Sequence, residues 1–278
     1  MTIVVTGATG NVGRPLVKEL VAGGADVRAV SRRPDSAAFP AQVKVFDTAA
    51  AAIQGATALF LNSRALGEEM ASVVRQAQRQ GVTRLVALSA INADDDFSRQ
   101  PSRYRGDRNK EADQLAVESG LEWVSLRPSV FVTNFAGMWS GQIRVGNVVN
   151  GPYATASSAP IVESDISSVA ARALLTDDLL GQRIPLTGPE ALTNAQMVDI
   201  IGSVLHRPLH YHEIPPELVR QRFIGLGFPA EFGDAYIAML AATVDRPATV
   251  TPDIERILGR PAASFGEWVA DQTHLFTN

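Results

Sequence analysis

Residues 1–33 read MTIVVTGATGNVGRPLVKELVAGGADVRAVSRR, and this stretch decides the fold. A short apolar run breaks into a glycine-rich turn, after which apolar residues recur at helical spacing over residues 12–20. Two glycines end that pattern, and a second apolar run follows at residues 25–31. A strand, a glycine turn, a helix and a second strand in this order predict a βαβ unit.

The glycine spacing in this unit suits a dinucleotide. Gly7 permits the tight turn, Gly10 lets the backbone approach a pyrophosphate, and Gly13 lets helix and strand pack closely. The N–H groups and the positive dipole end of the helix would then face the phosphates. The alternative is a glycine turn with a purely structural role. The predicted cofactor-binding loop comprises Gly7, Thr9, Gly10, Asn11, Val12 and Gly13.

The end of the second strand indicates which dinucleotide is bound. NAD-binding versions of this unit carry an acidic residue here that holds the ribose 2′-hydroxyl, whereas an arginine accommodates a 2′-phosphate. This chain has Ser31, Arg32 and Arg33 at that point and no acid. We therefore predict NADP(H) as the cofactor, the alternative being a solvated pair of arginines on a loop.

Polar or small residues also follow the later strands, which we predict at residues 43–46, 58–61, 84–88 and 122–126. Doubly wound sheets bind their ligands at the carboxyl ends of the strands. Asp47 could reach the adenine edge there, or it could simply form a turn. The remaining predicted cofactor-binding residues are Asp47, Asn62, Ser63, Ser89 and Pro128.

The regular βα alternation predicts an α/β fold with a doubly wound parallel sheet. We assign residues 1–134 to this nucleotide-binding domain, with a strand returning to the sheet near residues 182–188. Asp165 is expected to cap a helix over residues 166–175. We expect residues 135–278 to form a smaller, mostly helical substrate-covering domain, whose last part is broken at prolines.

Composition narrows the function further. The chain has 278 residues, a formal net charge of −4 and no cysteine, which makes nucleic acid an unlikely partner and excludes thiolate chemistry. No apolar run reaches the roughly 20 residues of a membrane span, and no signal peptide precedes the first strand, so we expect a cytoplasmic protein. His206, His210 and His212 cluster without a carboxylate at metal spacing, so we predict no metal site.

Five blocks of the sequence carry a resemblance to a known family; they are residues 6–13, 30–34, 119–128, 186–190 and 265–269. Together they resemble the NmrA-like branch of the atypical short-chain dehydrogenases/reductases. The resemblance covers almost the whole chain and implies a Rossmann domain, NADP(H) binding and a small C-terminal substrate domain. The family includes NADPH-dependent quinone and ketone reductases, among them tailoring enzymes of aromatic polyketides. It also includes redox-sensing regulators that bind the nucleotide without turnover.

The catalytic residues depart from the wider superfamily, whose active members present Tyr-x-x-x-Lys on one helix face. Here the nearest such residues are Tyr104 and Lys110, which lie six positions apart. On one continuous helix, the two side chains would be rotated by roughly 240 degrees relative to each other about the helix axis. We therefore expect Tyr104 to pack or contact substrate rather than to donate a proton. Ser89, Asn134 or the substrate's own hydroxyl is predicted to serve the reacting oxygen.

An aromatic-rich segment follows the last strand of the first domain. Its side chains either pack in a core or line a pocket for a small-molecule substrate. The residues concerned are Phe131, Phe135, Met138 and Trp139. The sequence thus predicts an NADPH-dependent reductase that acts on a bulky apolar ketone or quinone. This reductase lacks the usual Tyr-Lys pair. The alternative is an NADP(H)-binding sensor that acts through a protein partner.

Overall fold

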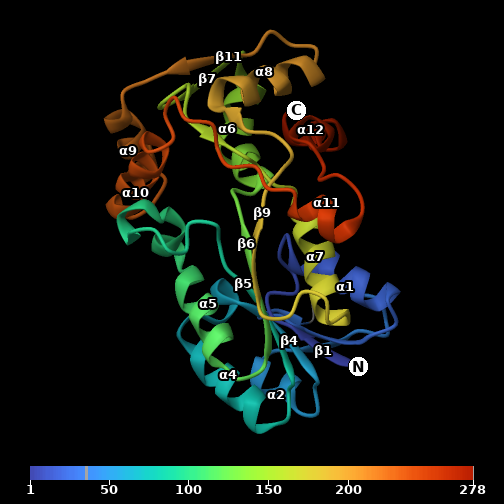
Figure 1. Ribbon diagram of the computed structural model, residues 1–278. Helices are drawn as coiled ribbons and strands as arrows, with labels where there is room; N and C mark the ends of the chain where they lie inside the picture. Colours follow the sequence, from blue (N-terminus) through green and yellow to red (C-terminus); the bar gives the residue numbers. More distant parts are fainter. Residues whose placement is uncertain (35–36, 278) are drawn as a thin grey trace. The chain divides into compact units, whose positions relative to one another are not determined.

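The computed structural model, which describes residues 1–34 and 37–277, contains one seven-stranded sheet. Its strands are β1 (Thr2–Val5), β2 (Asp26–Val30), β3 (Lys44–Phe46), β4 (Ala58–Asn62), β5 (Arg84–Leu88), β6 (Glu122–Pro128) and β9 (Gln182–Leu186). They lie in the order β3-β2-β1-β4-β5-β6-β9 (Figure 1). The neighbouring pairs from β3 to β6 are parallel, and β9 joins beside β6, so the predicted doubly wound sheet and its returning strand are confirmed.

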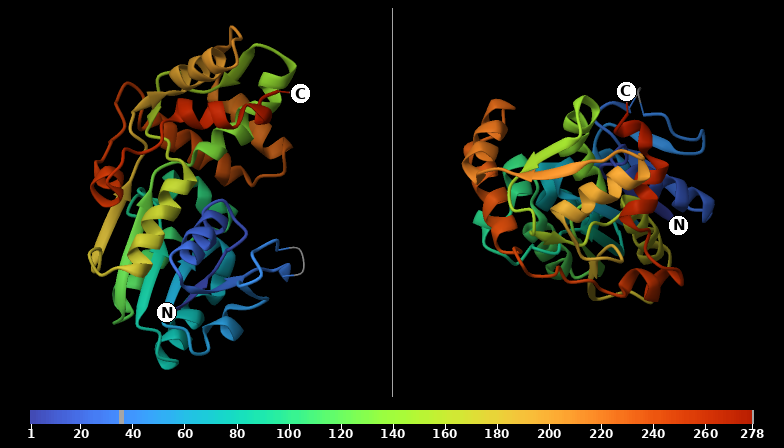
Figure 2. Two further views of the ribbon diagram at one scale, coloured as in Figure 1. Left: turned by 90° about the vertical axis from the view of Figure 1, so that its right-hand side faces the viewer. Right: turned by 90° about the horizontal axis from the view of Figure 1, so that it is seen from above.

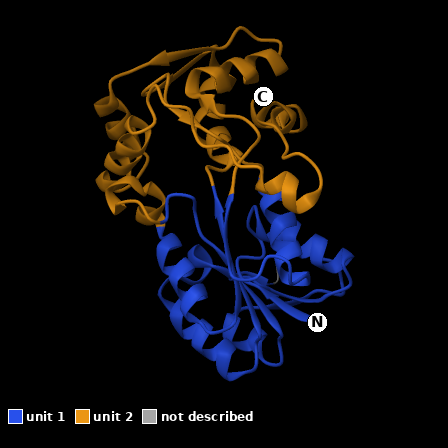
Figure 3. Cartoon of the chain, viewed as in Figure 1, with its two compact units in different colours: residues 1–93, 106–128, 163–185 blue, residues 94–105, 129–162, 186–278 orange. Residues whose placement is uncertain are grey.

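By its contacts the chain divides into two units (Figure 3). Unit 1 comprises residues 1–93, 106–128 and 163–185, and unit 2 comprises residues 94–105, 129–162 and 186–278. The single boundary at residue 134 therefore differs from the division in the structure. Sequence periodicity marks helices and strands but not which unit a helix joins.

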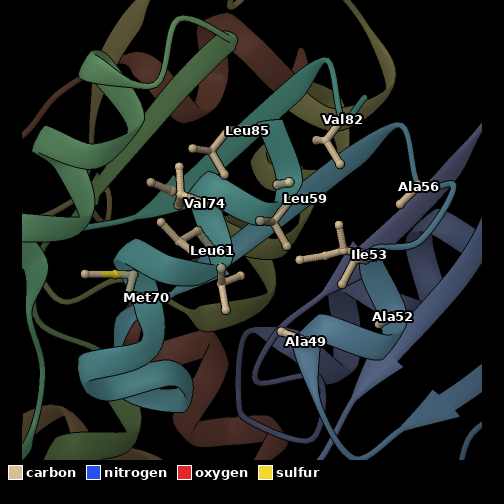
Figure 4. Packing of buried hydrophobic residues seen from close by; sticks show 14 of the residues in the cluster. Ala49, Ala52, Ile53, Ala56, Leu59, Leu61, Met70, Val74, Val82 and Leu85 are labelled. Atoms are coloured by element: carbon tan, nitrogen blue, oxygen red, sulfur yellow. The ribbon is translucent and has the colours of Figure 1, made fainter. Parts of the chain in front are cut away.

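The helices of unit 1 cover the sheet with their apolar faces. They are α1 (Gly13–Ala22), α2 (Ala49–Ile53), α3 (Ser63–Leu66), α4 (Met70–Arg79), α5 (Asn109–Glu118) and α7 (Glu163–Leu175), with a 3₁₀ turn at Gly67–Glu69. Side chains of β4 and β5, such as Leu59 and Leu85, meet those of α2 and α4, such as Ile53 and Val74 (Figure 4). This burial supplies the apolar contribution to the stability of unit 1.

Helix α7 begins three residues earlier than expected and packs against α1 (Figure 2). Asp165 lies inside its first turn and is 1% exposed, so the expected cap at this residue is wrong. Ser167, buried on the same helix, donates a hydrogen bond to the carbonyl of Val12. That contact ties α7 to the end of the glycine loop.

Among the described residues of unit 1, Arg84 and Asp113 are buried charged side chains, and each forms ion pairs with several partners. Arg84, at the start of β5, donates to Glu122 and Asp177 and to the carbonyls of Leu174 and Thr176 at the end of α7. A cation suits that position because the C-terminal end of a helix is partially negative.

Asp113 on α5 forms the second network. Its carboxylate accepts hydrogen bonds from Ser125, Arg127 and Arg183, which come from β6 and β9. Burial alone raises the pKa of Asp113, but the hydrogen bonds from Arg127, Ser125 and Arg183 outweigh it and hold the pKa below its ordinary value.

Unit 2 is mostly helical, as predicted. Its helices are α6 (Val132–Val145), α8 (Asn194–Val204), α9 (Pro216–Gly225), α10 (Ala230–Ala241), α11 (Asp253–Leu258) and α12 (Phe265–Asp271), with 3₁₀ turns at Phe97–Arg99, Pro101–Arg105 and Thr273–Leu275. It also has two small sheets, β10 (Leu192–Thr193) with β8 (Ser157–Ser158) and β11 (His210–Glu213) with β7 (Val148–Gly151).

Several prolines of unit 2 stand at the starts of helices, so they separate one helix from the next. Pro216 is the first residue of α9, while Pro229 and Pro252 directly precede α10 and α11. Proline fits this place because the first helical N–H groups have no partner within the helix and its φ is already helical. Residues 141–158 include the end of α6 and the strands β7 and β8.

Candidate functional site

The glycine loop connects β1 to α1, and its three glycines have different surroundings. Gly7 has a φ of +66°, and a Cβ there would lie 2.9 Å from the side-chain Nδ2 of Asn62. A Cβ on Gly13 would lie only 2.2 Å from the carbonyl oxygen of Gly7. A Cβ on Gly10 would meet only that same oxygen, at 3.3 Å. Sterics therefore require glycine at positions 7 and 13, whereas a Cβ at the exposed Gly10 would have this single tight contact.

The start of α1 is suited to an anion. Val12 occupies the N-cap position, and among the described residues no side chain caps this helix start and no acid stands in its first turn. Thr9, Gly10 and Asn11 are exposed around it. The positive end of the helix dipole is therefore open to a ligand such as a pyrophosphate.

Thr6 is a residue of this edge that the sequence reasoning missed. Its side chain is fully buried, and its hydroxyl donates to the carbonyl of Phe60 and accepts the N–H of Asn62, both at 2.8 Å. The hydroxyl thus joins the ends of β1 and β4, directly before the glycine turn. Its place at a strand end beside the first glycine was the available signal.

Asn62 is the last residue of β4, Ser63 follows it, and both have structural partners. The side-chain oxygen of Asn62 accepts the N–H of Ala65 at 3.3 Å and so caps α3. Ser63 is 3% exposed, and its hydroxyl accepts the N–H of Arg108 at 3.0 Å. A direct role for either in cofactor binding stays a prediction.

Ser89 and Pro128 lie at the ends of β5 and β6. The hydroxyl of Ser89 is buried and donates to the carbonyl of Asn109 at 2.9 Å. The carbonyl of Pro128 accepts the N–H of Ile91 at 2.9 Å. The Ser89 hydroxyl therefore already donates its one hydrogen bond. To donate to a substrate, it would have to break its hydrogen bond to the carbonyl of Asn109.

Ser31, Arg32 and Arg33 directly follow β2, as predicted. Ser31 is 6% exposed, and its hydroxyl accepts the N–H of Arg33 at 3.2 Å. Arg32 and Arg33 are exposed, and so is Asp47 at the end of the neighbouring strand β3. Two exposed cations on an anchored turn suit a phosphate group.

Tyr104 and Lys110 do not share a helix. Tyr104 lies in the 3₁₀ helix Pro101–Arg105 of unit 2, whereas Lys110 lies in α5 of unit 1. The argument from helical rotation, which assumed one continuous helix, therefore does not apply to them. Asn134, the other predicted catalytic residue, is exposed in the first turn of α6 in unit 2.

The aromatic segment of α6 divides into two parts. Phe135 and Trp139 are 4% and 3% exposed, their ring centres lie 5.0 Å apart, and they belong to the core of unit 2. Phe131 and Met138 are only half-buried. A contact with substrate stays a prediction for all four, and it suits the half-buried pair better.

The histidines of unit 2 do not form a metal-binding group. His210 and His212 are exposed on β11, and His206 follows α8 with a φ of 53°. Within the described residues, no group of three or more potential metal ligands occurs. Over the same residues, no helix has the length and apolar character of a membrane span.

The chain is similar to known NAD(P)H-binding proteins and reductases. The family model described as NAD(P)H-binding matches residues 7–177. The chain is 30% identical to a (4-alkanoyl-5-oxo-2,5-dihydrofuran-3-yl)methyl phosphate reductase of Streptomyces griseus, over 99% of both chains. It is 28% identical to an NAD(P)H azoreductase of Xenophilus azovorans, again over 99% of both.

Solved structures share the fold. An NADPH-dependent quinone oxidoreductase from Escherichia coli, complexed with NADPH, superposes with a TM-score of 0.81 at 18% identity. The match covers 99% of this chain and 100% of that one.

Proposed function

The chain belongs to the NAD(P)H-binding family, and we propose that it is an NADPH-dependent reductase of a bulky apolar ketone or quinone of the aromatic polyketide type. Within that family it is a reductase of the NmrA-like, atypical short-chain type. The proposal rests above all on one observation, the pair of exposed arginines that follows β2 beside an open, uncapped helix start.

The residues of unit 1 fit NADP(H). The start of α1 and the open face at Gly10 would hold the pyrophosphate, and Arg32 and Arg33 would hold the 2′-phosphate. The bound cofactor supplies the hydride. The protein contributes binding, orientation and exclusion of water, while Phe131 and Met138 would contact the apolar substrate.

The reacting oxygen needs a proton or a hydrogen-bond donor as it gains charge. Because the Ser89 hydroxyl already donates to Asn109, we favour Asn134 as the donor that stabilises this oxygen. The proton itself would then come from a phenolic or enolic hydroxyl of the substrate. With such a substrate, the enzyme would need no Tyr-Lys pair to supply the proton.

The test of the reaction is consumption of NADPH. A reductase oxidises NADPH in step with loss of quinone or ketone, which absorbance at the nicotinamide band follows. Azo and furanone compounds extend the panel, because two relatives are named for them. Saturable NADPH binding with no oxidation across the panel would favour the alternative, a redox sensor.

Cofactor choice provides a separate test. We expect NADP(H) to bind at least about tenfold more tightly than NAD(H), because each charge-assisted contact to the 2′-phosphate contributes about 1.5–3 kcal/mol. Replacing Arg32 and Arg33 together with alanine should remove most of that preference. Titration calorimetry with both cofactors measures it, and equal affinities in the native protein would contradict the proposal.

A further inference from the structure

Arg14 connects the start of α1 to the chain that follows the arginine pair. It is the second residue of α1, directly after Gly13, and is half-buried. Its Nη1 donates to the carbonyl of Ala38 at 3.0 Å, and its guanidinium carbon lies 5.3 Å from the centre of the Phe39 ring. One side chain thus makes a charged hydrogen bond and a cation–π contact to this segment.

A backbone hydrogen bond next to Ala38 connects the segment that Arg14 contacts to Arg33. The N–H of Ala37, beside Ala38, donates to the carbonyl of Pro34 at 3.1 Å, and Pro34 directly follows Arg33. From the other side, the Ser31 hydroxyl accepts the N–H of Arg33. The arginine pair is therefore held by Ser31 at one end and, through Pro34, by Arg14 at the other.

Arg14 stands at a place in α1 where a positive charge destabilises the helix. A cation in the first turn is disfavoured by the positive end of the helix dipole. In the part of the chain that the structure describes, no acid in that turn compensates for it. The contacts with Ala38 and Phe39, rather than helix stability, therefore account for an arginine at this place.

We propose that Arg14 is a positioning residue for cofactor selectivity. It fixes the turn that carries Arg32 and Arg33, so that both guanidinium groups are arranged for a 2′-phosphate before the cofactor arrives. This inference rests on the proposed function, in which the arginine pair recognises NADP(H). Arg14 itself is not required to touch the phosphate.

Arg14→Ala tests the proposal by the ratio of two affinities. We expect NADP(H) to bind about tenfold more weakly, as for loss of one charged hydrogen bond, and NAD(H) affinity to change by less than about threefold. A general loss of stability would lower both affinities together. Lys18→Ala is the matched control, because it removes an exposed cation one turn further along α1 and should leave the ratio unchanged.

Phe39→Ala separates positioning from direct contact. It removes no charge, yet it should reduce NADP(H) affinity by about threefold if the stack on Arg14 holds the turn. Amide hydrogen exchange of the cofactor-free protein at Ala37 should quicken in both Arg14→Ala and Phe39→Ala. An unchanged ratio of NADP(H) affinity to NAD(H) affinity in Arg14→Ala would overturn this inference and leave the proposed function standing. An unchanged NADP(H) affinity in Phe39→Ala would do the same. Equal affinities in the native protein would instead overturn the proposed function.

Discussion

At the scale of single residues, the glycine loop separates a steric role from a binding role. Gly13→Ala places a Cβ against the backbone of Gly7 and Ala8, at 2.2 Å and 2.8 Å, so backbone must move. Gly10→Val instead adds a side chain at an exposed position with one contact, 3.3 Å from the carbonyl oxygen of Gly7, where the pyrophosphate is proposed to lie. The two substitutions should therefore affect different properties of the protein.

We expect Gly13→Ala to lower the free energy of unfolding by about 1–3 kcal/mol, as for other overpacked sites. Gly10→Val should change stability by less than about 1 kcal/mol but abolish measurable NADP(H) binding. Denaturant titration and calorimetry measure the two effects. Undiminished NADP(H) affinity in folded Gly10→Val protein would show that the pyrophosphate lies elsewhere.

The proton donor is a second question at this scale. General acid catalysis typically contributes 10²- to 10⁴-fold, so a catalytic Tyr104 would lose that factor on replacement by phenylalanine. We expect Tyr104→Phe and Lys110→Ala each to change kcat by less than about tenfold, because the proposed function assigns that role to Asn134 and the substrate's own hydroxyl. Steady-state kinetics with a ketone or quinone that the native enzyme reduces decides the matter. A thousandfold loss with intact folding and NADPH affinity would restore the Tyr-Lys mechanism.

At the scale of elements, Asp113 joins α5 to β6 and β9 through Arg127 and Arg183. Its folded pKa is held below the ordinary value, so the stabilisation is present above the unfolded pKa of about 3.9 and is lost as pH falls through the folded pKa. Removing the charge while keeping the shape should therefore abolish this part of the acid sensitivity.

Asp113→Asn should cost about 3 kcal/mol near neutral pH, because it leaves two arginines without their partner. The difference from the native protein should shrink as the pH is lowered below about 4. Urea unfolding across that range measures it. Asp178→Asn, which breaks an exposed pair with Arg172, is the control and should cost less than about 1 kcal/mol. Parallel pH curves for native and Asp113→Asn protein would refute the assignment.

Helix α4 shows which features of the fold could be predicted from the sequence. The buried residues of α4 recur at helical spacing in the sequence; they are Met70, Val73, Val74 and Ala77. Such a face is visible because burial imposes a local period on the sequence. The roles of Thr6 and Arg14 were not visible, because each depends on a partner 24 or more positions away. Hydrogen bonds over such distances leave no periodic signal.

At the scale of the whole molecule, each unit is built from three separate segments of chain. The sequence predicted one boundary at residue 134 and a single strand returning to the sheet near residues 182–188, because the regular βα alternation loosens after the last repeat. It could not predict that α7 packs on α1, because that choice depends on tertiary contacts between segments far apart.

This interleaving predicts the behaviour of a fragment. Residues 1–134 lack α7 and β9, so the face of α1 that packs on α7 would be exposed to water. We expect this fragment to show no cooperative thermal transition and no NADP(H) binding, because both need that face covered. Circular dichroism and calorimetry test it against the full chain. A cooperatively folded fragment that binds NADP(H) would show that the nucleotide-binding domain ends near residue 134 after all.

The pairing of α1 with α7 also bears on how the protein is made. About 140 residues must leave the ribosome between the end of α1 and the start of α7, roughly 7–28 s at 5–20 residues per second. During that interval the nascent glycine loop and its helix have no completed partner layer. The first segment to be translated is thus among the last to reach its native surroundings, and the growing chain must be kept from aggregating until then.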